Sequence, residues 1–96
     1  MNYKTSNENI KIPTILYGTA WKKEQTAKCV ETALLSGFRG VDTAGQPKHY
    51  QEHLVGEGLL KAYKNGLNRE DIYLQTKFTP IDGQDVTNMP YDKKVL

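Results

Sequence analysis

The chain has very little cysteine, no long apolar run and no apolar leader. Cys29 is the only cysteine among the 96 residues, so no disulfide can form within the chain, which is typical of a reducing compartment. No window approaches the ~18 apolar residues of a membrane span, and residues 1–10 lack the apolar centre of a signal peptide. We therefore expect a cytoplasmic protein with no membrane partner.

Blocks of like charge and clusters of metal ligands are also missing. The formal net charge is +2, from 13 Lys and Arg against 11 Asp and Glu, and both signs are spread along the chain. This distribution predicts no nucleic-acid partner. The two histidines and the acidic residues show no ligand spacing, so we expect no metal site. No feature indicates a protein partner.

What the chain does contain is the material for one small domain. Hydrophobic residues make up 38% of it and charged residues 25%, with a mean hydropathy of -0.66. A chain of this size buries roughly 60–65% of its unfolded surface on folding. We expect one domain with a small core.

Short apolar segments alternate with amphipathic ones along residues 13–80. The segments predicted as strands are Thr14–Tyr17, Phe38–Asp42 and Ile72–Phe78. Apolar residues at helical spacing predict helices over Glu24–Ser36 and around Leu54–Tyr63, with stops at Gly37 and Asn65-Gly66. A βαβαβ order with short joins implies parallel strands and an α/β architecture. A barrel and an open sheet both fit it.

The two ends of the chain have different compositions. Residues 1–12 are sparse in apolar side chains, and the turn-prone cluster Asn7-Glu8-Asn9 predicts a β-hairpin that caps the domain. Residues 81–96 contain Asp82-Gly83 and Met89-Pro90, which predict a loop leading to a helix that begins near Tyr91.

Candidate chemistry lies where each predicted strand stops, because ligands of α/β folds bind beyond the carboxyl ends of the strands. The residues there are Gly18 to Lys22 after the first strand, Asp42 with Tyr50 in the loop beyond, and Lys77 at the third. Adjacent parallel strands would bring Asp42 and Lys77 within salt-bridge reach. Taken alone, that pair is more often a structural ion pair than a catalytic one.

Four stretches in this order resemble the aldo-keto reductases, and the resemblance covers about residues 12–91. They are Tyr17-Gly18-Thr19, Gly37-Phe38-Arg39-Gly40-Val41-Asp42-Thr43-Ala44, Val55-Gly56-Glu57-Gly58-Leu59 and Arg69-Glu70-Asp71-Ile72-Tyr73-Leu74-Gln75-Thr76-Lys77. The resemblance implies the N-terminal portion of a (β/α)8 TIM barrel, with about three of the eight strands. It also implies an oxidoreductase that uses NADPH to reduce an aldehyde or ketone to an alcohol.

By the same resemblance, Asp42, Tyr50 and Lys77 would be catalytic, together with a histidine that would lie beyond residue 96. The ammonium of Lys77 would favour the phenolate form of Tyr50 and so make it a better proton donor. Asp42 would hold Lys77 charged and in place. Tyr50 is the only tyrosine between Asp42 and the Val55-Gly56 match.

The family match also gives binding roles to residues after the first strand. Gly18, Thr19 and Asp42 would lie along the nicotinamide and its ribose, Lys22 near the phosphates, and Trp21 in the wall of the substrate pocket.

Three other residues are expected to have no such role. His49 and His53 are predicted to be solvent-exposed residues of a loop and a helix start, and Cys29 is predicted to pack inertly against the core.

The alternative hypothesis is a non-catalytic product. Residues 1–96 would form an incomplete barrel domain, and such a fragment would lack the histidine and the segments that grip the cofactor. It would then be a truncated remnant or a small interaction module, inactive as an isolated chain.

Overall fold

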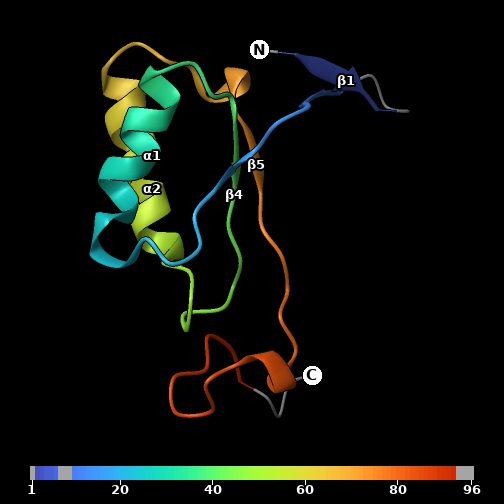
Figure 1. Ribbon diagram of the computed structural model, residues 1–96, viewed down its shortest axis with the longest axis vertical. Coiled ribbons are helices and arrows are strands. Elements are labelled where there is room, and N and C mark those ends of the chain that lie inside the picture. The colour runs from blue at the N-terminus through green and yellow to red at the C-terminus, as the bar shows by residue number, and fades with distance from the viewer. Residues whose placement is uncertain (1, 7–9, 93–96) are drawn as a thin grey trace.

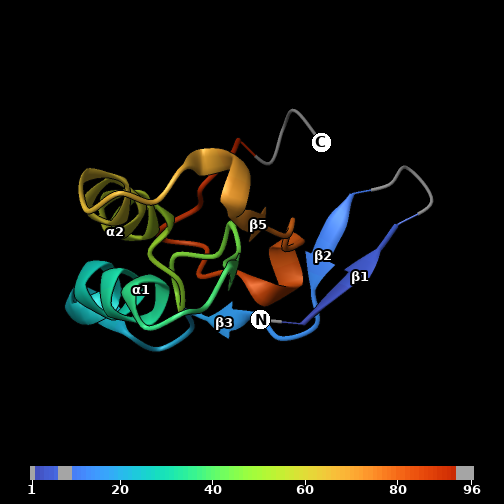
Figure 2. The ribbon, with the colours of Figure 1, turned by 90° about the horizontal axis from the view of Figure 1, so that it is seen from above.

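The computed structural model describes residues 2–6 and 10–92. Two helices cover one side of a small parallel sheet, and an antiparallel strand pair lies on the other side (Figures 1 and 2). That pair consists of β1 (Tyr3–Thr5) and β2 (Lys11–Pro13), with Lys4 opposite Ile12. It confirms the predicted strand pairing near the N-terminus, whereas the expected turn, Asn7-Glu8-Asn9, lies outside the described residues.

The parallel sheet has the order β3-β4-β5 and is formed by β3 (Tyr17–Gly18), β4 (Gly40–Asp42) and β5 (Tyr73–Gln75). Gly18 pairs with Asp42, and Asp42 pairs with Gln75 on its other side. The predicted parallel βαβαβ order is confirmed. In the described part of the chain, β3 and β5 each pair with β4 alone.

The first predicted strand, Thr14–Tyr17, was placed wrongly. Pro13 belongs to β2, and the amide of Thr14 donates to the carbonyl of Asn2 at 2.9 Å. Residues 14–16 therefore connect the hairpin to the sheet, and Ile15 is 60% exposed where a buried strand was expected.

The helices are α1 (Thr26–Leu35), preceded by the 3-10 turn η1 (Lys23–Gln25), and α2 (Glu52–Lys64). Both end at the predicted glycines, which have the positive φ angles of +119° at Gly37 and +105° at Gly66. After Gly37 the amide of Phe38 donates back to the carbonyl of Ala33 at 3.1 Å. Glycine is favoured here because backbone with a positive φ costs residues with a Cβ roughly 1–2 kcal/mol.

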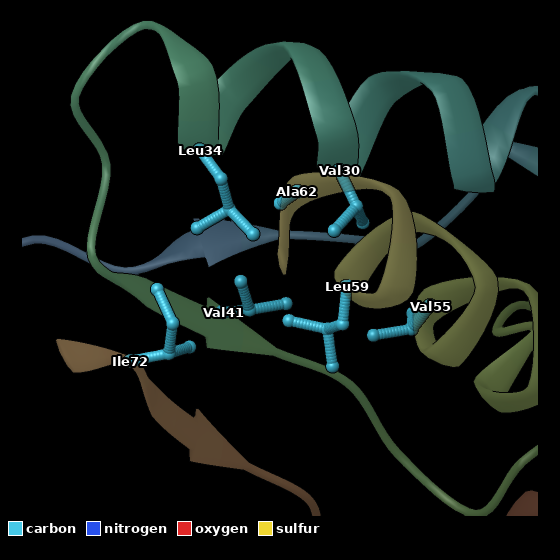
Figure 3. Close-up of a cluster of buried hydrophobic side chains, with 7 residues drawn as sticks. All are labelled: Val30, Leu34, Val41, Val55, Leu59, Ala62 and Ile72. Atoms are coloured by element: carbon cyan, nitrogen blue, oxygen red, sulfur yellow. The ribbon is translucent and has the colours of Figure 1, made fainter. Parts of the chain in front are cut away.

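The core lies between the helices and the sheet (Figure 3). Its seven buried side chains are Val30, Leu34, Val41, Val55, Leu59, Ala62 and Ile72. Leu35 and Leu60 were expected in the apolar stripes but are 50% and 60% exposed, because each lies one position past a buried neighbour and turns out of the interface.

Gly58 allows the close approach of α1 and α2. A Cβ at this position would lie 2.6 Å from the carbonyl oxygen of Ala27 and 2.8 Å from Cβ of Val30. The glycine in Val55-Gly56-Glu57-Gly58 is thus required by helix packing.

The segment after β5 folds back over the loop that follows β4. The 3-10 turn η2 (Arg69–Asp71) precedes β5, and η3 (Ile81–Gly83) follows it. The buried Gln84 donates to the carbonyl of Gly45 at 2.8 Å, and Gln46 donates to the carbonyl of Gly83 at 3.0 Å. The helix expected to begin near Tyr91 falls almost entirely outside the described residues, which end at position 92.

Candidate active site at the carboxyl ends of the strands

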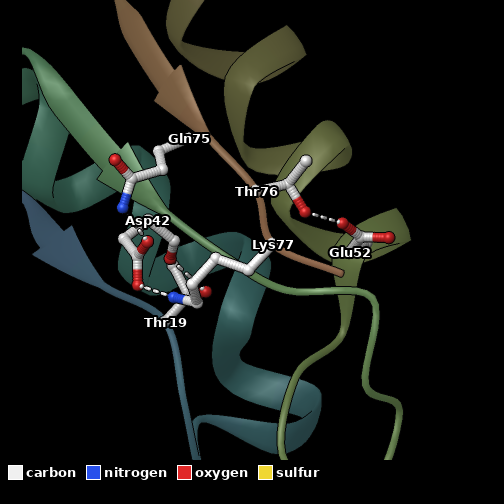
Figure 4. Close-up of polar contacts among 6 residues, drawn as sticks. All are labelled: Thr19, Asp42, Glu52, Gln75, Thr76 and Lys77. Atoms are coloured by element: carbon white, nitrogen blue, oxygen red, sulfur yellow. Dashed lines mark hydrogen bonds and ion pairs between the residues drawn. The ribbon is translucent and has the colours of Figure 1, made fainter. Parts of the chain in front are cut away.

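Asp42 and Lys77 meet where β4 and β5 end. Nζ of Lys77 lies 2.6 Å from Oδ2 of Asp42 (Figure 4), which confirms the expected pairing. The side chain of Lys77 is 44% exposed and that of Asp42 is 19% exposed. The hydrogen bond that Lys77 donates to Asp42 raises the pKa of Lys77 above its ordinary value of 10.5, so the amine is charged at neutral pH.

Tyr50 is the third member of this group. Nζ of Lys77 lies 5.2 Å from the centroid of its ring, and the contact with Tyr50 adds to the raised pKa of Lys77. The backbone amide of Tyr50 donates a hydrogen bond of 2.9 Å to the carbonyl of Gln46, which holds the loop in place. The three residues proposed from the family resemblance as catalytic are therefore neighbours.

Asp42 is held through both its side chain and its backbone. Nε2 of Gln75 donates to Oδ1 of Asp42 at 2.8 Å. The amide and the hydroxyl of Thr19 donate to the backbone carbonyl of Asp42 at 3.2 and 2.8 Å. Gln75 was missed from the sequence, although strand alternation places it on the face of the strand that Lys77 shares.

Two of the residues expected to bind the cofactor, Gly18 and Thr19, differ in exposure. Gly18 is exposed, and a Cβ added there would meet no atom within 4 Å. Thr19 is fully buried, and its hydroxyl is engaged with Asp42. The open surface at Gly18 and the carboxylate of Asp42 fit a flat ring and a hydroxyl donor, which are the groups that a nicotinamide riboside presents. Thr19 fits as a support for Asp42.

Trp21 lies in the loop after β3 and stacks on His49. The ring centroids are 3.9 Å apart, and the amide of Trp21 donates to the carbonyl of His49 at 2.8 Å. His49 is half-buried, so its predicted solvent exposure was wrong, because Trp21 covers it. His53 is exposed on α2, as expected. No residue spacing in the sequence indicates the contact between Trp21 and His49.

The backbone of the same loop is strained. Trp21 has a φ of 65° and Lys23 a φ of 50°, values that residues other than glycine adopt rarely. Nζ of Lys22, between them, lies 5.7 Å from the ring centroid of Tyr17. A phosphate contact of Lys22 would require its side chain to leave that ring.

A second set of contacts holds Lys77 beyond the end of β5. The hydroxyl of Thr76 donates to Oε2 of Glu52 at the start of α2 in a short bond (Figure 4). The amide of Gly45 donates to the carbonyl of Lys77 at 3.0 Å. A hollow of about 280 Å³ opens beside this region and is lined in part by Tyr50, Glu52 and Asn88.

Cys29 is half-buried on α1 beside Tyr17. Burial raises the pKa of Tyr17, and the contact with Cys29 adds to that shift. Cys29 has no base in contact with it in the described contacts, which fits packing rather than nucleophilic chemistry.

Across the residues described, no three His, Cys, Asp or Glu side chains are grouped so that they could hold a metal ion. Neither described helix is long and apolar enough to cross a bilayer.

Parallel strands with helices on one face, and polar residues gathered at their carboxyl ends, are the arrangement found in each portion of a (β/α)8 barrel. Solved structures share this arrangement. The aldose reductase of Schistosoma japonicum superposes with a TM-score of 0.67 and 32% identity, over 79% of this chain and 25% of that one. An aldo/keto reductase of Brucella melitensis superposes with a TM-score of 0.64 and 30% identity, over 78% of this chain and 28% of that one.

Curated sequences point the same way, whereas no protein-family model matches. The NAD(P)H-dependent D-xylose reductase of Pachysolen tannophilus is 38% identical over 78 residues, which are 80% of this chain and 24% of that protein. An aldo-keto reductase of Mycolicibacterium smegmatis is 34% identical over 94 residues, 95% of this chain and 32% of that protein. The chain spans about a quarter to a third of the length of these relatives, and its curated homologues and structural neighbours are aldo-keto reductases, matched over a portion of the barrel.

Proposed function

We propose that the chain supplies the proton-donating part of a carbonyl reductase site that uses NADPH to reduce an aldehyde or ketone to an alcohol. The observation that carries this proposal is the cluster of Asp42, Lys77 and Tyr50, with an ion pair of 2.6 Å and an ammonium 5.2 Å from the phenol ring. The relatives named as reductases, one of them NAD(P)H-dependent, support a nicotinamide cofactor and a small carbonyl substrate.

When bound, the cofactor would supply a hydride to the carbonyl carbon. The hydroxyl of Tyr50 would donate its proton to the carbonyl oxygen as negative charge develops there. Lys77 would stabilise the phenolate that remains, because an ammonium nearby favours that form. Asp42 would keep Lys77 charged and oriented through the bond that raises its pKa.

Four residues would meet the ligands. Gly18 and Asp42 would lie along the nicotinamide and its ribose, with Thr19 supporting Asp42 from behind. Lys22 would turn from Tyr17 to the phosphates. Trp21, 67% exposed, would form part of the substrate wall.

A second function is favoured by the exposure of the site. Lys77 is 44% exposed, and the outer strands of the described sheet each pair with β4 alone. Electrostatic stabilisation of a transition state is weak where water surrounds the charges. The isolated 96-residue chain would then be a non-catalytic module, with Asp42, Tyr50 and Lys77 present but without turnover.

NADPH titration of the purified chain, followed by cofactor fluorescence, tests both functions when it is combined with NADPH oxidation in the presence of an aldehyde. Circular dichroism establishes that the chain is folded. Turnover that Tyr50→Phe abolishes without loss of binding supports the reductase. Tyr63→Phe, on the core side of α2, is the matched control and should leave turnover unchanged.

The other outcomes are equally informative. Binding without turnover supports the non-catalytic module. A folded chain that binds no NADPH contradicts the cofactor proposal.

A further inference from the structure

We propose that Gln75 is a positioning residue of this site, which fixes the carboxylate of Asp42 so that one oxygen faces Lys77. The catalytic meaning of this inference rests on the function proposed above. The contact itself does not, because it can be measured in the chain without any ligand.

Gln75 and Lys77 each donate a hydrogen bond to a different oxygen of the Asp42 carboxylate. Nε2 of Gln75 is 2.8 Å from Oδ1 of Asp42, and Nζ of Lys77 is 2.6 Å from Oδ2. The terminal torsion of an aspartate is broad, so one bond alone leaves the carboxylate free to rock. Two bonds from opposite sides define its plane.

The register of the sheet places Gln75 directly beside Asp42. Asp42 and Gln75 are paired residues of neighbouring parallel strands, so their side chains rise from the same face of the sheet. Figure 4 shows the amide nitrogen of Gln75 turned toward Asp42. The carbonyl of Asp42 is held by Thr19, so backbone and side chain are both fixed.

The neutral amide suits this position because it adds no charge. A cation at position 75 would compete with Lys77 for the carboxylate, and an anion would repel it. A glutamine satisfies Oδ1 and leaves the ion pair at Oδ2 intact. Without this donor, the carboxylate would spend part of its time turned away from Lys77.

NMR of the unaltered chain gives the first test. The carboxyl carbon of Asp42 and the side-chain amide protons of Gln75 are followed together as the pH is lowered. We expect the amide protons to shift with the same midpoint as the carboxyl carbon, because protonation weakens the acceptor at Oδ1. Amide signals that remain fixed while Asp42 titrates would overturn the proposal.

The second test uses Gln75→Leu, which keeps the approximate size and removes the donor. Lysines are labelled by reductive methylation with carbon-13, and the signal of Lys77 is identified by its loss in Lys77→Met. We expect the pKa of Lys77 to move down toward the ordinary lysine value. The matched control is Leu74→Ala, on the opposite face of the same strand, which should leave that pKa unchanged.

An unchanged Lys77 titration in a folded Gln75→Leu chain would also overturn the proposal. If that variant does not fold, the measurement on the unaltered chain decides. Failure of the proposed reductase function has a different signature, which is absence of NADPH binding while the amide signals of Gln75 still shift together with the carboxyl signal of Asp42.

Discussion

Nζ of Lys77 lies 2.6 Å from Oδ2 of Asp42, although the two residues are 35 positions apart in the chain. Their bond raises the pKa of Lys77 above the ordinary 10.5. A raised lysine pKa stabilises the folded state fully at pH below 10.5, and this contribution is lost as the pH rises through the folded-state pKa. The pair should therefore stabilise the protein throughout the neutral range.

We predict that Lys77→Met lowers the free energy of unfolding near neutral pH by under about 1 kcal/mol, because water screens a partly exposed pair. The difference between the unaltered chain and the variant should shrink at alkaline pH and in high salt. Urea unfolding across this pH range measures it. A difference that grows as the pH rises would contradict the sign of the pKa shift.

Gly58→Ala should destabilise the protein by roughly 1–3 kcal/mol, because its methyl group would overlap Ala27 and Val30 and push the helices apart. Gly56→Ala is the matched control in the same helix, where a Cβ meets nothing within 4 Å. That change should stabilise α2 by about 0.5–1 kcal/mol through its higher helix propensity. Thermal unfolding followed by circular dichroism compares the two, and equal effects would refute the packing argument.

Gly18→Ala separates ligand binding from folding. The added methyl group projects into open space, so stability should be unchanged within about 0.5 kcal/mol. Under the proposed function the same methyl group stands where the nicotinamide would lie, and NADPH affinity should fall roughly tenfold. Isothermal titration measures that affinity. Unchanged binding by a chain that does bind NADPH would remove Gly18 from the cofactor site.

Trp21 is the only tryptophan of the chain, so intrinsic tryptophan emission comes from Trp21 alone and is sensitive to its contact with His49. His49→Leu should change the intensity and wavelength of that emission, because the stacked ring at 3.9 Å is removed. His53→Leu, at an exposed position of α2, should leave the emission as it is. Equal spectra for all three proteins would show that the stacking does not persist in solution.

The helices and the central ion pair could be predicted because local signals and topology agree there. Apolar spacing placed Val30, Leu34 and Val55 in the core, and the parallel strand order alone brought Asp42 to Lys77. Each of these inferences depends on a periodicity or a strand end, which the sequence displays directly.

Contacts made by loops were not predictable in the same way. His49 was expected in solvent, but the strained turn at Trp21 folds an indole over it. The first strand was misplaced because Thr14 bonds to Asn2, a partner that no local spacing indicates. Gln75 was overlooked since a glutamine in a strand carries no signal of its own, and only the register with Asp42 gives it a role.

Of the strands that the structure describes, only β4 has a neighbour on each side. Local opening of a protein begins where few hydrogen bonds must break, so the outer strands should fray before the middle one. Asp42 in β4 would then keep its position, while Gly18 in β3 and Lys77 after β5 would move relative to it. The carboxylate of Asp42 would be the fixed point of the site. The fraction of time in which Gly18, Asp42 and Lys77 all occupy their described positions would set how often the site is assembled.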